Sequence, residues 1–112
     1  MQPDSRKLLQ DMLQAGQAIQ RFAGGKALAD LKSDELLRSG IYFQFLVVGE
    51  ALSQLTKSDP ATAAKISEHA RIIAFRNQII HGYARIDDEI TWRILERKVP
   101  ILIQEVENLL VE

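Results

Sequence analysis

Apolar residues recur every three or four positions along almost the whole chain, which is the spacing of one face of an α-helix. No convincing alternation of apolar and polar residues, the pattern of a half-buried strand, is present. The first helix is predicted from about Asp4 to about Phe22, with Pro3 at its start and Gly24 at its end. Its apolar stripe consists of Leu8, Met12, Ala15, Ile19 and Phe22.

A second helix is predicted from about Ser33, which serves as the N-cap, to about Leu55. The stretch between Gly24 and Lys32 is interpreted as a loop with room for one helical turn. The apolar positions of this second helix are Leu37, Ile41, Phe45, Val48, Leu52 and Leu55.

The break between the second and third helices is marked by Asp59 and Pro60, a capping residue followed by the residue preferred at the first helical position. The pattern then predicts one continuous third helix to about Ile80. Gly82 is predicted to end it in the left-handed conformation that glycine adopts without strain.

A fourth helix is predicted to begin at the acidic residues 87–89, which suit the positive end of a helix dipole. Pro100 removes one backbone donor, so the helix should kink or be interrupted between Arg97 and Val99. Four amphipathic helices with short connections predict an all-α, antiparallel four-helix bundle in one domain, residues 1–112.

Apolar residues on the second and third helices occupy more than one face. Phe43 and Leu46, for example, lie off the main stripe of the second helix. One small bundle cannot easily bury all of them, so a homodimer through one of these faces is predicted.

Composition restricts the chemistry that the chain can carry. The chain has no cysteine and only two histidines, so thiolate chemistry is excluded and a zinc site, or any other metal or cofactor, is not expected. Neither a leader peptide nor an apolar run long enough to span a membrane is recognised, and a reducing cytoplasm is compatible. The net charge of −1 argues against a general grip on nucleic acid but leaves room for a local basic cleft. Its candidates are Arg71, Arg76, Arg85, Arg93, Arg97 and Lys98.

Arg76 is the unusual residue in this pattern, because it points into the apolar side of the third helix that Ile72, Ile79 and Ile80 form. A guanidinium there needs a partner, and Glu50 is the structural candidate. The corresponding structural interpretation makes His81 a helix-end residue that satisfies terminal carbonyls.

The functional alternative joins Arg76, Asn77 and His81 into a phosphodiester-cleaving set. Arginine binds phosphate through two parallel hydrogen bonds, and histidine transfers protons near neutral pH. Five helical residues rotate by about 500°, so Arg76 and His81 would diverge by about 140° in a continuous helix. They converge if the helix ends at Ile80, or if a symmetric dimer brings Arg76 of one chain to His81 of the other.

The segment Arg76-Asn77-(x3)-His81-Gly82-Tyr83 fits the RN-x3-H-x-Y pattern of the HEPN superfamily, and the chain resembles the HepT-like (DUF86) toxins within it. Val48-Gly49-Glu50-Ala51 is similar to the "GEA" segment of that family, and the tail from Asp87 to Leu110 also resembles it. The resemblance spans Leu8 to Leu110.

The resemblance implies a prokaryotic toxin of a type II/VII-like toxin–antitoxin system. Its activity would be metal-independent RNA cleavage at a dimer cleft, with Arg76 and His81 as catalytic residues and Asn77 in support. The implied partners are RNA and an MNT-class nucleotidyltransferase antitoxin, which can add AMP to Tyr83. The alternative is a non-catalytic dimeric module that docks with, and is modified by, such a nucleotidyltransferase.

Overall fold

The structure is a computed structural model that describes the backbone of all 112 residues and every side chain except that of Tyr83. It contains helices and connecting turns, and no strand occurs in the part of the chain described. The all-α prediction is therefore confirmed. The elements are α1 (Pro3–Ala23), α2 (Leu28–Ser33), α3 (Glu35–Ser58), α4 (Pro60–Ala63), α5 (His69–Gly82), the 3₁₀ helix η1 (Tyr83–Arg85), α6 (Asp88–Arg97) and α7 (Val99–Leu110).

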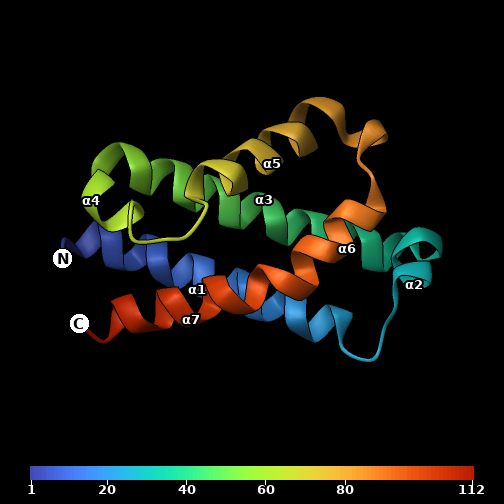
Figure 1. The fold of residues 1–112 in the computed structure, drawn as a ribbon, viewed down its shortest axis with the longest axis horizontal. Helices are drawn as coiled ribbons and strands as arrows, with labels where there is room; N and C mark the ends of the chain where they lie inside the picture. The colour runs from blue at the N-terminus through green and yellow to red at the C-terminus, as the bar shows by residue number, and fades with distance from the viewer.

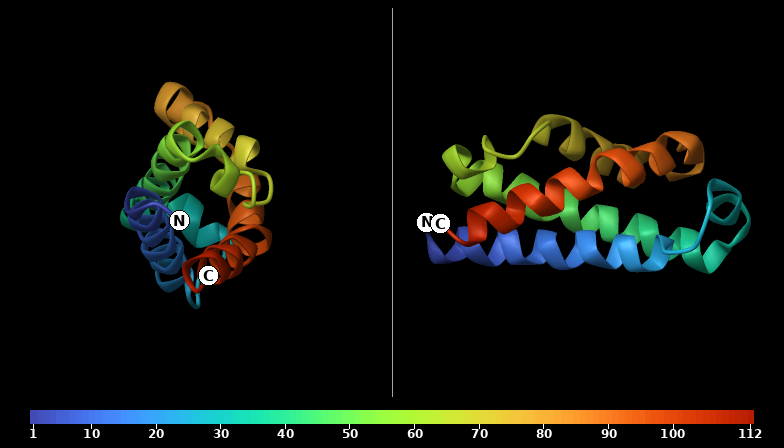
Figure 2. Two further views of the ribbon diagram at one scale, coloured as in Figure 1. Left: turned by 90° about the vertical axis from the view of Figure 1, so that its left-hand side faces the viewer. Right: turned by 60° about the horizontal axis from the view of Figure 1, so that its bottom comes forward.

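The long elements form an antiparallel bundle. α1 and α5 run in one direction, and α3 and the α6–α7 pair run in the other, so both termini lie at the same end (Figure 1). α3 packs against α1 on one side and α5 on the other, and α7 packs against α1. The end-on view in Figure 2 shows α5 at the outer edge of the bundle, beside α3. The helix that carries the candidate residues is therefore its most peripheral long helix.

The core consists of two neighbouring apolar clusters. One centres on Leu9, Leu52 and Val106 near the chain termini, and the other on Ile41, Phe45 and Phe75 towards the opposite end. Phe45 of α3 and Phe75 of α5 meet edge to face, with ring centroids 5.3 Å apart. This contact anchors the middle of α5 to α3.

The predicted start of the second long helix was wrong by one residue. The carboxylate of Asp34 accepts the amide hydrogen of Leu37 and caps α3, whereas Ser33 is the last residue of α2 and its hydroxyl donates to the Ala29 carbonyl. The region predicted as a loop thus contains a short helix, α2. It forms because Leu31 is completely buried.

The prediction of one continuous third helix was also wrong. α4 begins as predicted, with Asp59 capping Thr62, but it ends at Ala63, and α5 starts only at His69. Glu105 of α7 accepts hydrogen bonds from the amide and the hydroxyl of Ser67, at 3.0 and 2.6 Å. Glu68 adopts a left-handed φ of 56°, which cannot continue a right-handed helix.

The interruption at Pro100 is confirmed. α6 ends at Arg97 and α7 begins at Val99, with Pro100 in its first turn. The acidic residues 87–89 start α6, as predicted, and Asp87 accepts the amide hydrogen of Glu89. The break matters for packing, because α6 contacts α2 whereas α7 contacts α1.

Several apolar side chains remain at the surface, as the dimer prediction requires. Phe43 is 60% exposed, and Ile80 and Ile101 are each 48% exposed, whereas Leu46 is half-buried. Among the described residues, no helix combines the length and apolar character needed to cross a bilayer.

Candidate functional site

Arg76 lies where α5 crosses closest to α3, opposite Gly49. A Cβ atom at Gly49 would lie 2.5 Å from the Cγ of Arg76 and closer still to its Cβ. Any larger residue at position 49 would therefore push α5 away. The physical role of the Gly-Glu-Ala segment is now clear: the glycine allows the approach, and the residue after it receives the guanidinium.

The guanidinium of Arg76 is held by two oxygen atoms. Its Nη2 forms an ion pair with Glu50, and its Nη1 donates to the Oδ1 of Asn77 at 2.9 Å. The Arg76 side chain is 24% exposed and that of Glu50 is 49% exposed, so this pair lies at the surface. The partner of Arg76 is therefore Glu50, the structural candidate, but the ion pair is not buried in the apolar core as that interpretation implied.

Glu50 also receives a hydrogen bond from the side-chain amide of Gln54, at 3.0 Å. This bond, together with the charge of Arg76, lowers the pKa of Glu50 below its ordinary value. Glu50 is therefore ionised at neutral pH and supplies the negative charge that pairs with Arg76. The Nε of Arg76 is buried and has no hydrogen-bond partner among the described atoms, so the protein satisfies this guanidinium only in part.

The helix does not end before His81. α5 continues through His81 and Gly82 and tightens into η1, and Gly82 does not have a positive φ. The predicted left-handed termination at Gly82 was wrong. Consequently, the first route to convergence, in which the helix stops at Ile80 and His81 swings round, does not occur.

His81 lies in a surface groove instead. The groove is lined by α5 and η1, where Asn77, His81 and Arg85 follow one another at intervals of four residues, and also by Ile86 and Ile90. Arg85 was considered only for a general basic cleft, and its alignment with His81 was missed. Continuing the helical spacing beyond His81 would have found it.

Arg76 and His81 therefore face different directions on one helix. Arg76 turns to Glu50 on α3, whereas His81 lines the groove beyond Asn77. Asn77 connects the two sides, because it bonds Arg76 and also lines the groove. Within one chain the two candidate catalytic groups are neighbours along the helix but are not brought together.

Tyr83 is in η1, immediately after α5, but its side chain lies outside the described residues. The segment after it is anchored by a polar cluster between α3 and α6. The Tyr42 hydroxyl bonds Asp88 at 2.8 Å and Thr91 at 2.6 Å, and Arg38 forms an ion pair with Asp88. Burial raises the pKa of Tyr42 well above its ordinary value, so it remains a neutral donor.

Four of the six basic residues considered for one cleft lie at three separate places. Arg76 faces α3 and Arg85 lines the His81 groove, whereas Arg71 and Lys98 lie at a cavity on another side of α5. Among the residues described, no three His, Cys, Asp or Glu side chains are grouped so that they could hold a metal ion.

Comparison with family models identifies one family. Residues 12–109 match the family described as "Ribonuclease HepT-like". A protein of Methanocaldococcus jannaschii named "Putative RNase MJ0127" is 26% identical over 107 residues, which cover 96% of this chain and 88% of the relative. No solved structure was found to match. With nearly its whole length matched, and with the arginine and histidine of the family pattern on one helix, the chain belongs to the HepT-like ribonuclease family.

Proposed function

We propose that this protein is a metal-independent endoribonuclease and the toxin of a type II/VII-like toxin–antitoxin system in a prokaryotic cytoplasm. The observation that carries the proposal is the position of Arg76, held by Gly49 and Glu50 at a partly exposed site, with His81 exposed on the same helix. Family membership supports the ribonuclease class.

The reaction needs no metal and no protein nucleophile. The RNA 2′-hydroxyl attacks the adjacent phosphorus, and the bond to the 5′-oxygen of the next nucleotide breaks. A 2′,3′-cyclic phosphate and a 5′-hydroxyl result. Neutral His81 accepts the 2′-hydroxyl proton, and the imidazolium so formed returns a proton to the leaving oxygen. Arg76 stabilises the charge that develops on the phosphoryl oxygens, and Asn77 supports its orientation.

The active unit is a homodimer in which Arg76 of one copy and His81 of the other serve one phosphate. Because the two groups point apart on a single α5, a shared site requires a second chain. The apolar side chains of Phe43 and Ile80, exposed on α3 and α5, supply surface for such a contact.

Mixing two inactive variants tests the shared site directly. We expect Arg76→Ala and His81→Ala each to lower RNA cleavage by about 10²-fold or more. Dissociating and reassembling them together makes about half of the dimers mixed, each with one intact site, so about a quarter of wild-type cleavage returns. Cleavage is measured on a labelled RNA in the presence of EDTA.

The controls distinguish a loss of catalysis from a loss of the folded structure. Each variant must keep the wild-type circular dichroism spectrum, and Arg76→Ala should melt within a few degrees of wild type because its ion pair lies at the surface. No recovery in the mixture would mean that each site is complete within one chain. Undiminished cleavage by His81→Ala would refute the catalytic assignment.

Regulation is proposed to act through Tyr83, two residues after His81. An MNT-class nucleotidyltransferase antitoxin would transfer AMP from ATP to the Tyr83 hydroxyl, releasing pyrophosphate and leaving a bulky anion beside the RNA path. Intact mass measured after incubation with ATP and the enzyme should rise by one or more AMP units, and Tyr83→Phe should prevent the first addition. Transfer to a protein that never cleaves RNA would instead favour the non-catalytic docking module.

A further inference from the structure

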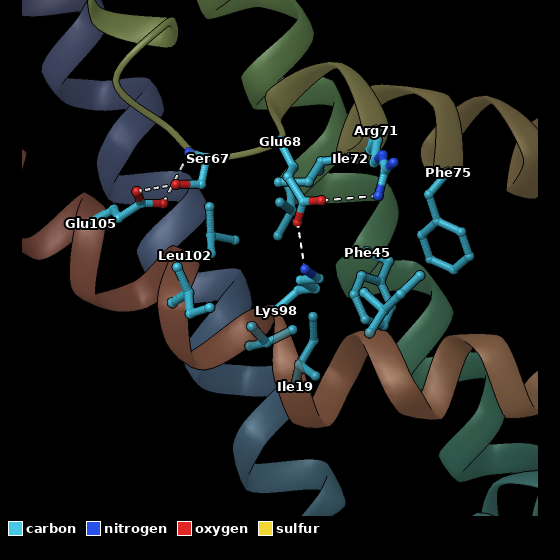
Figure 3. Close-up of a pocket in the computed structure, with 14 residues that line it drawn as sticks. Ile19, Phe45, Ser67, Glu68, Arg71, Ile72, Phe75, Lys98, Leu102 and Glu105 are labelled. Carbon is cyan, nitrogen blue, oxygen red and sulfur yellow. Dashed lines mark hydrogen bonds and ion pairs between the residues drawn. The ribbon is translucent and has the colours of Figure 1, made fainter.

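A cavity of about 280 Å³ lies beneath α5, between that helix and α6–α7 (Figure 3). Its walls come from α1, α3, α5 and the α6–α7 pair, and one wall residue, Ile19 of α1, is completely buried. Phe75 lines both this cavity and the His81 groove and so separates them. The other apolar lining residues are Phe45, Val48, Ile72, Ile94, Val99, Ile101 and Leu102.

Polar residues gather only at the mouth of the cavity. Glu68 bridges Lys98 at 2.6 Å and Arg71 at 3.0 Å, and Figure 3 shows these side chains across the opening. The hydrogen bond and charge of Lys98, followed by the charge of Arg71, lower the pKa of Glu68, so this bridge persists at neutral pH. Glu105 also lies at the mouth, bonded to Ser67. The two acidic side chains at the mouth therefore cancel the charge of Arg71 and Lys98. The mouth has no net charge that would favour a charged ligand.

The backbone at this mouth is held in an uncommon conformation. Glu68 has a φ of 56°, which costs a non-glycine residue free energy and persists only where its surroundings enforce it. The bonds from Ser67 to Glu105 and from Glu68 to Lys98 tie this turn to α7. Both contacts lie at the mouth of the cavity, because all four of these residues line it.

We propose that this cavity is a binding site for a small uncharged aromatic molecule of two fused rings. Protein interiors are otherwise close-packed, and dry apolar cavities of about 150 Å³ already bind benzene. The present cavity has room for a second ring, and its apolar walls with a charge-balanced mouth favour a neutral ligand. A bound molecule would contact Ile72 on α5 and Leu102 on α7, joining two helices that otherwise pack on different partners.

Indole is the probe for the test, which does not depend on ribonuclease activity. We expect saturable binding with one site per chain by calorimetry. In methyl NMR spectra, indole should shift the signals of Val48, Val99 and Leu102, which line the cavity, and not those of Leu9 and Val106, which are buried in the core but do not line it. Absence of saturable binding by folded wild-type protein would overturn the proposal.

A matched pair of variants shows where the probe binds. Ile72→Trp places an indole ring in the cavity, and we expect it to weaken indole binding by about tenfold or more. Ile73→Trp is the control, because Ile73 is the next residue on α5, is also half-buried, and does not line the cavity. It should bind indole as wild type does.

A second variant that fills the cavity keeps the test decisive if Ile72→Trp does not fold. Leu102→Phe enlarges the opposite wall, and it should also weaken binding if its circular dichroism spectrum and cooperative melt remain native. Equal indole affinity in wild type and in every folded filling variant would mean that the probe binds elsewhere, and the proposal would be wrong.

Discussion

At the scale of single residues, the site depends on having glycine, which lacks a Cβ atom, at position 49. Gly49 has no Cβ, and this alone lets the Arg76 stem cross α3 at contact distance. Gly82, the other glycine near the candidate groups, lies inside α5, and a Cβ there would meet no described heavy atom within 4 Å. The two glycines look alike in sequence and have opposite physical roles.

Substituting the two glycines tests this difference. Gly49→Ala should lower the free energy of unfolding by about 1–3 kcal/mol, because α5 must move to relieve the clash. Gly82→Ala should raise it by about 0.5–1 kcal/mol, because alanine is favoured over glycine within a helix. Urea unfolding followed by circular dichroism measures both. A destabilised Gly82→Ala protein would indicate that position 82 is not helical.

A second residue-scale test concerns Ser5, a fully buried residue whose hydroxyl donates to the Asp59 carboxylate at 2.7 Å. This bond, together with that from Thr62, lowers the pKa of Asp59 below its ordinary value of 3.8. Between the two pKa values the unfolded chain binds more protons than the folded protein, so the stabilisation is present at neutral pH. It is lost as the pH falls through the folded-state pKa.

Ser5→Ala should therefore destabilise the protein most at neutral pH. The difference in free energy of unfolding between wild type and Ser5→Ala should shrink as the pH drops below about 4, where Asp59 is protonated in the unfolded chain. Thermal melts of both proteins from pH 7 to pH 3 measure it. A difference that is constant over this range would mean that the Asp59 charge does not contribute to the contact.

At the scale of elements, helix ends are decided by which side chain reaches a free amide. Ser33 and Asp34 are both good capping residues, and sequence alone favoured the first. The burial of Leu31 extends α2 through Ser33, and this leaves Asp34 in an extended conformation that can cap α3.

Asp34→Ala should destabilise the protein by about 1 kcal/mol, because the Leu37 amide loses its acceptor. Ser33→Ala should change stability by less than about 0.5 kcal/mol, because its hydroxyl bonds an exposed carbonyl within α2. The two variants differ by one position and are compared by chemical denaturation. Equal effects would show that the cap is shared between the two residues.

At the scale of the whole molecule, α5 is an outer helix whose far side no other long helix covers (Figure 2). Phe43 on α3 and Ile80 on α5 leave apolar surface on the two helices that also hold Glu50 and Arg76. This arrangement suits a symmetric contact in which two copies of the candidate groups approach each other.

Phe43→Glu should shift the dimer that we propose towards monomer, without lowering the melting temperature measured at low protein concentration, because Phe43 is 60% exposed within one chain. Ile101→Glu is the control: Ile101 is also exposed, but it lies on α7. Sedimentation velocity over a range of concentrations measures the change. If Phe43→Glu sediments as wild type does, this face is not the interface.

Much of the fold was predictable because it depends on local patterns. The spacing of apolar residues identified α1, α3 and the α6–α7 pair, and Pro100 and Asp59 marked their breaks correctly. The turn at residues 64–68 was not predictable in this way. It exists because Glu105, 38 positions later in the chain, accepts hydrogen bonds from Ser67. The local preferences of residues 60–80 do not reveal this distant partner.

The sequence by itself determined the all-helical class, the family, and the presence of an arginine and a histidine five residues apart, because residue type and helical period suffice for these. Tertiary structure alone decided that Gly49 lets α5 approach α3 closely and that the ion pair of Arg76 lies at the surface. It also decided that His81 lines a groove to which Arg76 does not contribute. These outcomes depend on distances between helices, which are set by the packing of side chains far apart in the chain.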